Sequence, residues 1–261
     1  MKITAFVGSA RRAGATCAAT LQFLDHLQSL GDGVQVEIVF LSDYNIRLCR
    51  GCKICFLRGE ECCPLKDDRD VLIEKMMDSD GVVFASPNYS FQVSAIMKTF
   101  LDRLGFVFHR PCFHGKTFTS IVVQGFHGGS KIVKYLDFVG RGLGFNVVRG
   151  NCITALEPMT EKQRRSIAEA SARHARRFHK QLLKPPYPSP SIFQLMVFRM
   201  GRTSIRQMLA EDKRDHTYYC AHGWFDSPYF YPTRLGLLKT ALGAAFDWMA
   251  ARIFKPESET V

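Results

Sequence analysis

Short apolar, β-branched runs alternate with longer amphipathic stretches through the first 155 residues of the chain. The short runs predict five strands, at Lys2–Gly8, Val34–Phe40, Gly81–Ser86, Phe118–Gln124 and Phe145–Ile153. Between them, apolar residues return every three or four positions and predict helices at Thr16–Leu30, Arg69–Asp78, Val93–Phe106 and Gly129–Leu143. This alternation is typical of an α/β fold, a doubly wound parallel sheet that binds ligands at the carboxyl ends of its strands.

A proline-rich segment, Lys184–Pro190, marks the clearest internal boundary. A long helix is predicted before it, at Thr160–Leu183, and two amphipathic helices after it, at Ser191–Leu209 and Thr233–Phe254. The last two flank a predicted loop rich in aromatic residues: Tyr218, Tyr219, Trp224, Phe225, Tyr229, Phe230 and Tyr231. We therefore expect a ligand-binding α/β domain over residues 1–184 and a helical extension over 185–261 that packs on the core or on a partner subunit.

The composition is that of a soluble protein, with 261 residues, 46% of them apolar, and no uncharged apolar stretch long enough to span a membrane. The first residues lead from a short strand into a glycine turn, unlike a signal peptide, so a cytoplasmic location is expected. The net charge is +11, and much of the excess lies on the predicted helix Thr160–Leu183. A solvated helix face is favoured over a nucleic-acid site, because no nucleic-acid-binding motif accompanies these charges.

The first predicted strand ends in a glycine-containing loop, Gly8–Thr16, that runs directly into a helix. Unpaired amides at the helix N-terminus, together with Ser9, Thr16 and an arginine, provide donors for a phosphate. The loop lacks the Gly-Lys-Ser/Thr of a Walker loop and the GxGxxG of a dinucleotide site, so a monophosphate such as that of FMN fits better than ATP. The alternative is an ordinary strand-to-helix turn.

Two further loops follow predicted strands and are expected at the same sheet edge. The first, Ala85–Phe91, offers backbone amides to the polar rim of a planar ring, with Tyr89 or Phe91 beside it. The second, Gln124–Gly129, has three glycines that permit close approach of the backbone to a ligand. His127 is either a donor to a flavin carbonyl or a surface residue.

Five of the nine cysteines lie within fifteen positions, as Cys49, Cys52, Cys55, Cys62 and Cys63. Such spacing suits an iron–sulfur cluster or zinc, and the alternatives are free or disulfide-bonded thiols. A cluster is favoured over zinc, because zinc cannot change its redox state beside a flavin. Cys63 is favoured over Cys62 as the fourth ligand because it precedes Pro64, as the last cysteine of a bacterial ferredoxin run precedes proline.

Three motifs in order, GSARRAGAT, CRGCKICFLRGEECCPLKDD and SPNYSFQVSAIMKTFLDR, resemble the NAD(P)H-dependent FMN reductase group of flavodoxin-like proteins. The cysteine run resembles the iron–sulfur flavoprotein branch, in which a cysteine stands before an Asp-Asp pair as Cys63 stands before Asp67-Asp68. The resemblance covers residues 1–155 and implies a five-stranded sheet of order 2-1-3-4-5, in homodimers or homotetramers. The Lys213…Tyr219…Trp224…Tyr229 pattern of the tail also resembles extensions of relatives, less specifically.

The resemblance also implies the site residues. Those implied for the FMN phosphate are Ser9, Arg11, Ala15, Thr16 and Cys17, and those implied for the flavin ring are Pro87, Asn88, Tyr89, Ser90, Gly125, Phe126, His127 and Gly128. A 4Fe–4S cluster is implied on Cys49, Cys52, Cys55 and Cys63, with Cys62 as the competing ligand.

The expected function is a flavin-dependent oxidoreductase that accepts electrons on FMN from NAD(P)H or a ferredoxin-like donor and exchanges them with the cluster or an external acceptor. No side chain is assigned as a catalytic acid or base. Two alternatives stay open: a cluster-free NAD(P)H-dependent FMN, quinone or nitro reductase, and a non-enzymatic flavodoxin-like carrier or redox sensor.

Overall fold

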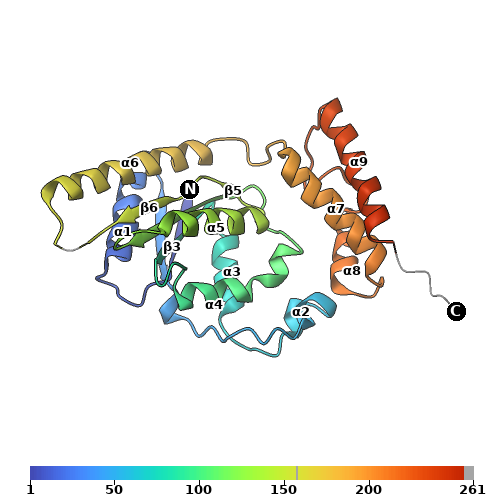
Figure 1. The fold of residues 1–261 in the computed structure, drawn as a ribbon, viewed down its shortest axis with the longest axis horizontal. Helices are drawn as coiled ribbons and strands as arrows, with labels where there is room; N and C mark the ends of the chain where they lie inside the picture. Colours follow the sequence, from blue (N-terminus) through green and yellow to red (C-terminus); the bar gives the residue numbers. More distant parts are fainter. Residues whose placement is uncertain (157, 256–261) are drawn as a thin grey trace. The chain divides into compact units, whose positions relative to one another are not determined.

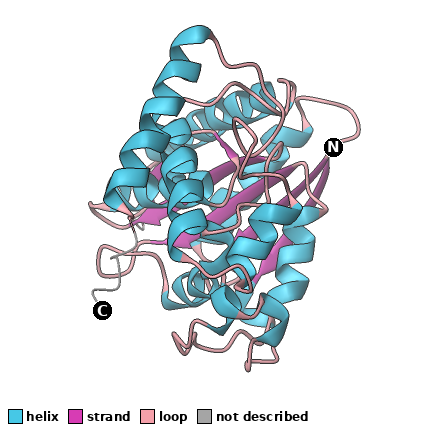
Figure 2. Ribbon diagram, turned by 90° about the vertical axis from the view of Figure 1, so that its right-hand side faces the viewer, coloured by secondary structure: helices cyan, strands magenta, loops and turns pink. Residues whose placement is uncertain are grey.

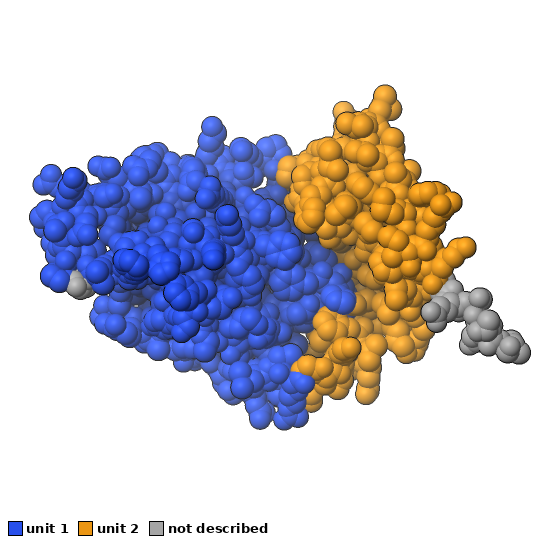
Figure 3. Space-filling model, viewed as in Figure 1, with its two compact units in different colours: residues 1–50, 65–186 blue, residues 51–64, 187–261 orange. Residues whose placement is uncertain are grey.

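The computed structural model describes residues 1–156 and 158–255 (Figure 1). The chain forms two compact units, coloured separately in Figure 3. Unit 1 comprises residues 1–50 and 65–186, and unit 2 comprises residues 51–64 together with the described part of 187–261. The cysteine segment 51–64 thus makes its contacts chiefly with the C-terminal helices. The expected domain boundary after Lys184 stays a prediction.

Unit 1 is built on a parallel sheet whose strands are ordered β2-β1-β3-β4-β5, which confirms the predicted flavodoxin-like arrangement. The strands are β1 (Lys2–Val7), β2 (Gln35–Phe40), β3 (Gly81–Pro87), β4 (Thr117–Gln124), β5 (Asn146–Val147) and β6 (Asn151–Thr154). β1, β3 and β4 occupy the middle of the sheet and are almost wholly buried. Their long apolar runs reflect burial on both faces.

The predicted fifth strand is interrupted, and its two parts, β5 and β6, both pair with β4. Val147 pairs with Phe118 and Asn151 with Ile121, so three residue steps along β4 lie opposite four steps from β5 to β6. The extra residue forms a bulge. Gly150 sits in it, where its N–H donates to Asp137 Oδ1 at 3.1 Å and a Cβ would lie 2.1 Å from Ser120 Oγ. The prediction of one continuous strand at Phe145–Ile153 was therefore wrong in this detail.

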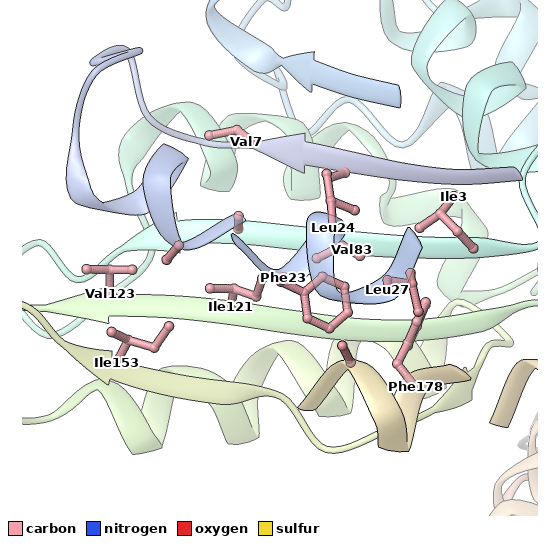
Figure 4. Packing of buried hydrophobic residues seen from close by; sticks show 14 of the residues in the cluster. Ile3, Val7, Phe23, Leu24, Leu27, Val83, Ile121, Val123, Ile153 and Phe178 are labelled. Carbon is pink, nitrogen blue, oxygen red and sulfur yellow. The ribbon is translucent and has the colours of Figure 1, made fainter. Parts of the chain in front are cut away.

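Helices cover both faces of the sheet, as Figure 2 shows. On one face, α1 (Ala15–Gln28) and α6 (Glu161–Leu182) pack on alternate strand residues through Phe23, Leu24, Leu27 and Phe178 (Figure 4). On the other, Phe6 and Phe84 form edge and stacked ring contacts with Phe100 of α4 (Ala95–Arg103). The remaining elements of unit 1 are α3 (Arg69–Met77), α5 (Gly129–Gly142) and the short 3₁₀ turns η1 (Leu41–Asp43) and η3 (Gly105–Phe108).

Unit 2 contains α2 (Ile54–Leu57), η2 (Glu60–Cys62), α7 (Ile192–Met208), α8 (Arg214–Ala221) and α9 (Leu237–Ile253). A capping box between Ser191 and Gln194 begins α7, and one between Thr160 and Gln163 begins α6 in unit 1. The aromatic segment is not a loop throughout, because Tyr218 and Tyr219 lie in α8. The Tyr219 ring packs at 4.9 Å from that of Trp224 in a small core with Leu195, Phe198 and Tyr229.

Among the described residues, no helix combines the length and apolar character needed to cross a membrane.

Candidate functional site

Three loops meet at the carboxyl edge of the sheet, one after each of β1, β3 and β4. The Gly8 N–H donates to Ala85 O at 2.8 Å, and the Ser94 hydroxyl donates to Gly8 O. The Asn88 N–H donates to Val123 O at 2.7 Å, which joins the second loop to the third. The three loops that the sequence predicted to share an edge are therefore tied into one structure.

The first loop turns tightly before α1. The Arg11 N–H donates to Ser9 Oγ at 3.3 Å, and Arg11 O accepts from the Gly14 N–H at 3.1 Å. No side chain of the described residues caps α1, whose N-cap is Gly14, so the amides of its first turn are available to an anion. Ala15 is the first helical residue and is exposed. A tight turn that leads into an uncapped helix N-terminus is the arrangement that a phosphate site requires.

The two adjacent arginines of this loop have different surroundings. Both terminal oxygens of Asp43 accept from Arg12 Nη2 at 2.7 Å, and the Arg12 guanidinium lies 4.6 Å from the Phe40 ring centre. The exposed Arg11 side chain makes no hydrogen bond or ion pair with another described residue. Arg11 is therefore the arginine that is free to reach a phosphate.

Thr16 and Cys17, also predicted for the phosphate site, are buried at the start of α1. Thr16 O accepts from the Thr20 hydroxyl at 2.8 Å, which stabilises the first turns of the helix. Burial raises the pKa of the Cys17 thiol, and the charge of Arg12 only partly opposes this. Cys17 is therefore a neutral thiol at neutral pH.

The second loop is linked to the third through Asn88. Its Nδ2 donates to His127 O at 2.9 Å, whereas its buried Oδ1 has no hydrogen-bond partner among the described residues. An acceptor left without a partner is unfavourable, and a ligand that brings an N–H group to Asn88 would satisfy it. Pro87, immediately before it, is buried at the end of β3.

A strained turn follows Asn88. Tyr89 and Gln92 exchange backbone hydrogen bonds of 3.0 and 2.9 Å, and the two residues between them, Ser90 and Phe91, have φ of 50° and 63°. Positive φ is unfavourable for residues with a Cβ and is concentrated at functional sites. The Phe91 ring lies against Gly128, where a Cβ would approach it to 2.7 Å. Gly128 also has φ of 92°, a conformation that favours glycine at this contact between the second and third loops.

Exposed aromatic rings surround this point. Tyr89, Phe91 and Phe126 are 56%, 62% and 82% exposed. The His127 ring lies 5.1 Å from that of Phe91 and 5.0 Å from that of Phe126, and Gly125 leaves the adjoining backbone open. Such a patch of rings suits a flat aromatic ligand. A phosphate cradle on the same edge makes the residues present a good fit for FMN.

The cysteine run presents thiols of different accessibility. Cys49, Cys52 and Cys62 are exposed, Cys55 is half-buried and Cys63 is buried. In the described part of the chain, three or more His, Cys, Asp or Glu side chains do not gather anywhere into a metal-binding group. The donor set suits a cluster in kind and number, but the segment does not hold its thiols together in this conformation.

The ends of the cysteine-bearing loop are fixed in unit 1 by an Asp-Asp pair. Asp67 accepts from the Arg47 N–H at 3.0 Å and from Arg103 Nη2 at 2.9 Å, and Asp68 accepts from the Asn45 N–H at 2.7 Å. In the sequence, only the family resemblance drew attention to Asp67 and Asp68. Its contacts show that it closes the base of the loop and fastens it to α4.

Two other residues escaped the sequence prediction. Ser94, the N-cap of α4, joins the first and second loops, and Gln124 Oε1 accepts from the Gly129 N–H at 2.7 Å at the start of α5. A serine three residues before the first buried helical residue was the available signal for Ser94. No sequence signal marked Gln124, because its contact with Gly129 depends on the path of the loop between them.

Comparisons with known proteins agree with this geometry. A sequence model described as NADPH-dependent FMN reductase matches residues 1–156. An iron-sulfur flavoprotein from Archaeoglobus fulgidus is 36% identical over 160 residues, which cover 58% of this chain and 71% of that protein.

Solved structures share the fold. RosB with bound 8-demethyl-8-formylriboflavin-5'-phosphate superposes with a TM-score of 0.57 at 13% identity, covering 91% of this chain and 92% of that one. The NAD(P)H:quinone oxidoreductase from Methanothermobacter marburgensis gives a TM-score of 0.53 at 17% identity, covering 67% and 96%.

Proposed function

Since the chain belongs to the NADPH-dependent FMN reductase family, with an iron-sulfur flavoprotein among its relatives, we propose that it passes electrons from NAD(P)H through FMN to a 4Fe–4S cluster or an external acceptor. Membership makes it an NAD(P)H-dependent flavin oxidoreductase. The cluster, the residues that hold each group and the acceptor are the proposed part. A ferredoxin-like donor is a second source of electrons.

The observation that supports this proposal most is the union of a phosphate cradle and an aromatic patch on one sheet edge. We assign the FMN phosphate to the Arg11 guanidinium, the Ser9 and Thr16 hydroxyls and the first amides of α1. The flavin ring is assigned to the second and third loops, where Asn88 Oδ1 accepts from a ring N–H. Tyr89, Phe91 and Phe126 flank the ring and exclude water from it.

When bound, FMN takes two electrons from a nicotinamide and releases them singly or together. The side chains of this site bind and orient the flavin, and none is assigned a proton-transfer role. His127 lies beside the aromatic patch as a donor to a ring carbonyl. The positive charge of Arg11 favours an anionic cofactor, whereas the Asp43 carboxylate offsets that of Arg12.

The cluster is assigned to Cys49, Cys52, Cys55 and Cys63, with Cys62 as the competing fourth ligand. Thiolates of this number and spacing are the donors that 4Fe–4S clusters require, and the cluster exchanges one electron at a time. Ligation requires the segment to draw its thiols together. A reducing cytoplasm, our proposed location, keeps such thiols available.

The decisive experiment is anaerobic purification, with flavin, iron and sulfide measured on the same sample of each variant. Arg11→Ala should weaken FMN binding about tenfold, because a charged hydrogen-bond partner of the phosphate is lost. Arg12→Ala is the matched control, since Asp43 and Phe40 already engage Arg12. Equal FMN dissociation constants for wild type and Arg11→Ala would remove Arg11 from the site.

The same samples decide between the two reductase hypotheses. About four iron and four sulfide per flavin in wild type, reduced in Cys63→Ser, support the cluster. FMN with NADPH oxidation but no iron after anaerobic reconstitution would instead identify a cluster-free reductase of quinones or nitro compounds. Bound FMN without NADH or NADPH oxidation by any added acceptor would favour a carrier or redox sensor.

A further inference from the structure

The cysteine segment and the C-terminal helices form one compact unit, although more than 120 residues of chain separate them. Within the segment, α2 and η2 are joined into a single folded piece. The Gly59 N–H, at the start of η2, donates to Ile54 O of α2 at 3.3 Å, and the Cys62 thiol donates to Arg58 O, at the end of α2, at 3.7 Å. This piece carries three of the thiols assigned to the cluster: Cys55, Cys62 and Cys63.

Helix α8 holds this piece through a two-point ion pair. Arg214 Nη2 lies 3.1 Å from Glu60 Oε1, and Arg214 Nε lies 3.4 Å from Glu60 Oε2. Paired guanidinium and carboxylate groups fix direction as well as distance. The two side chains are 32% and 26% exposed, so solvent screens the pair only in part. Glu60 is the first residue of η2, two positions before Cys62.

The helix that presents Arg214 is itself anchored. Tyr219, one turn further along α8, is 4% exposed and packs on Trp224, which is 5% exposed. Trp224 Nε1 donates to Phe230 O at 3.0 Å. The aromatic residues of the tail therefore fix the position of α8, and Arg214 on this helix holds the cysteine segment through Glu60.

An open pocket of about 660 Å³ lies between the segment and α8. Its lining includes Leu57, Arg58, Cys62, Lys213 and Thr217. The pocket gives reagents access to Cys62, while Cys63 is only 8% exposed. Alkylation of Cys63 therefore requires the segment to open, and its rate reports how firmly the segment is held.

We propose that Arg214 is a positioning residue: through Glu60 it keeps the piece that carries Cys55, Cys62 and Cys63 ordered. Fewer residues then have to be ordered when the thiols are drawn together around a cluster, so that the C-terminal extension governs retention of the metal. The inference rests on the proposed cluster function. An interaction that orders ligands before binding lowers the entropy lost on binding, and supporting contacts of this kind strongly affect metal affinity.

The test uses the full-length protein, reconstituted anaerobically with ferrous iron and sulfide. Arg214→Ala should lose iron to a chelator about tenfold faster than wild type, with unchanged FMN content. In iron-free, reduced protein, alkylation of Cys63 by iodoacetamide should rise about fivefold, while that of exposed Cys220 stays constant. Arg206→Ala is the matched control, because Arg206 pairs with Asp226 in the same unit, outside the segment.

Glu60→Gln provides a second variant should Arg214→Ala not fold, and it should show the same two effects. Arg214→Lys, which keeps the charge but loses the two-point geometry, should fall between wild type and Arg214→Ala. Unchanged or slower iron loss in Arg214→Ala would overturn the proposal, as would unchanged alkylation of Cys63. If the wild-type protein takes up no iron, the cluster assignment is wrong, and the role of Arg214 in metal retention is wrong with it. The alkylation rates of Cys63 test separately whether Arg214 holds the segment.

Discussion

Asp67 and Arg103 form a buried ion pair at the base of the cysteine-bearing loop, with side chains 1% and 3% exposed. Burial raises the pKa of Asp67, but donors from Arg47, Arg103 and Arg69 outweigh it and hold this pKa below its ordinary 3.8. The carboxylate therefore stabilises the folded state fully above pH 3.8, and this contribution is lost as the pH falls through the lower folded value.

Asp67→Asn should lower the free energy of unfolding by about 3 kcal/mol at pH 7, because it removes a buried carboxylate that pairs with the buried guanidinium of Arg103. Urea denaturation measures the change, and the difference from wild type should shrink in acid. Asp102→Asn removes an exposed partner of Lys98 on the same helix and should change stability by less than about 1 kcal/mol. Equal losses in both variants would contradict the special role of the buried pair.

Helix α6 is fixed to the sheet by a histidine that must stay neutral. His174 is 1% exposed, and its Nε2 lies 2.7 Å from Thr119 Oγ1 of β4. Burial, with a smaller effect from the charge of Arg177, lowers the pKa of His174 to about 3. Unfolding lets the ring take up a proton below pH 6.5, so stability should decline as the pH falls from 6.5 toward 3.

His174→Gln removes this titration. Relative to the variant, wild type should lose up to about 1.4 kcal/mol of unfolding free energy per pH unit below 6.5. Urea denaturation at several values between pH 7.5 and 4.5 measures both proteins. Buried His114, whose pKa burial lowers to about 4, is present in both and cancels in the difference. Parallel pH profiles would show that His174 is not kept neutral in the fold.

The elements of unit 1 were predictable because periods of 2 and 3.6 are local properties of the chain, and the shared edge of parallel strands then brought the three loops together. Contacts distant in sequence were not predictable. The bulge at Gly150 depends on Ser120, and Arg214 lies 154 residues from Glu60. Ser90 and Phe91 have positive φ although neither is glycine. The sequence therefore contained no glycine that would have predicted this turn.

At the scale of the whole molecule, α9 presents an apolar face that is exposed among the described residues. Leu237 and Leu238 are 93% and 69% exposed, and Trp248 and Met249 are 58% and 43% exposed. Trp248 follows Leu237 by eleven residues, and Met249 follows Leu238 by the same number. Eleven residues are about three helical turns, so the four side chains lie on one side of the helix. Exposed apolar surface of this kind is typical of a subunit interface.

We therefore expect a homo-oligomer in which α9 forms part of the contact. Trp248→Glu should shift the protein to a smaller species, because a buried unpaired carboxylate opposes association. Light scattering after size-exclusion chromatography measures the molar mass against 29.6 kDa for one chain. Leu183→Glu, at a 67% exposed position at the end of α6, is the control and should keep the wild-type mass. A Trp248→Glu protein of unchanged mass would place the subunit contact elsewhere and leave the α9 face to another partner.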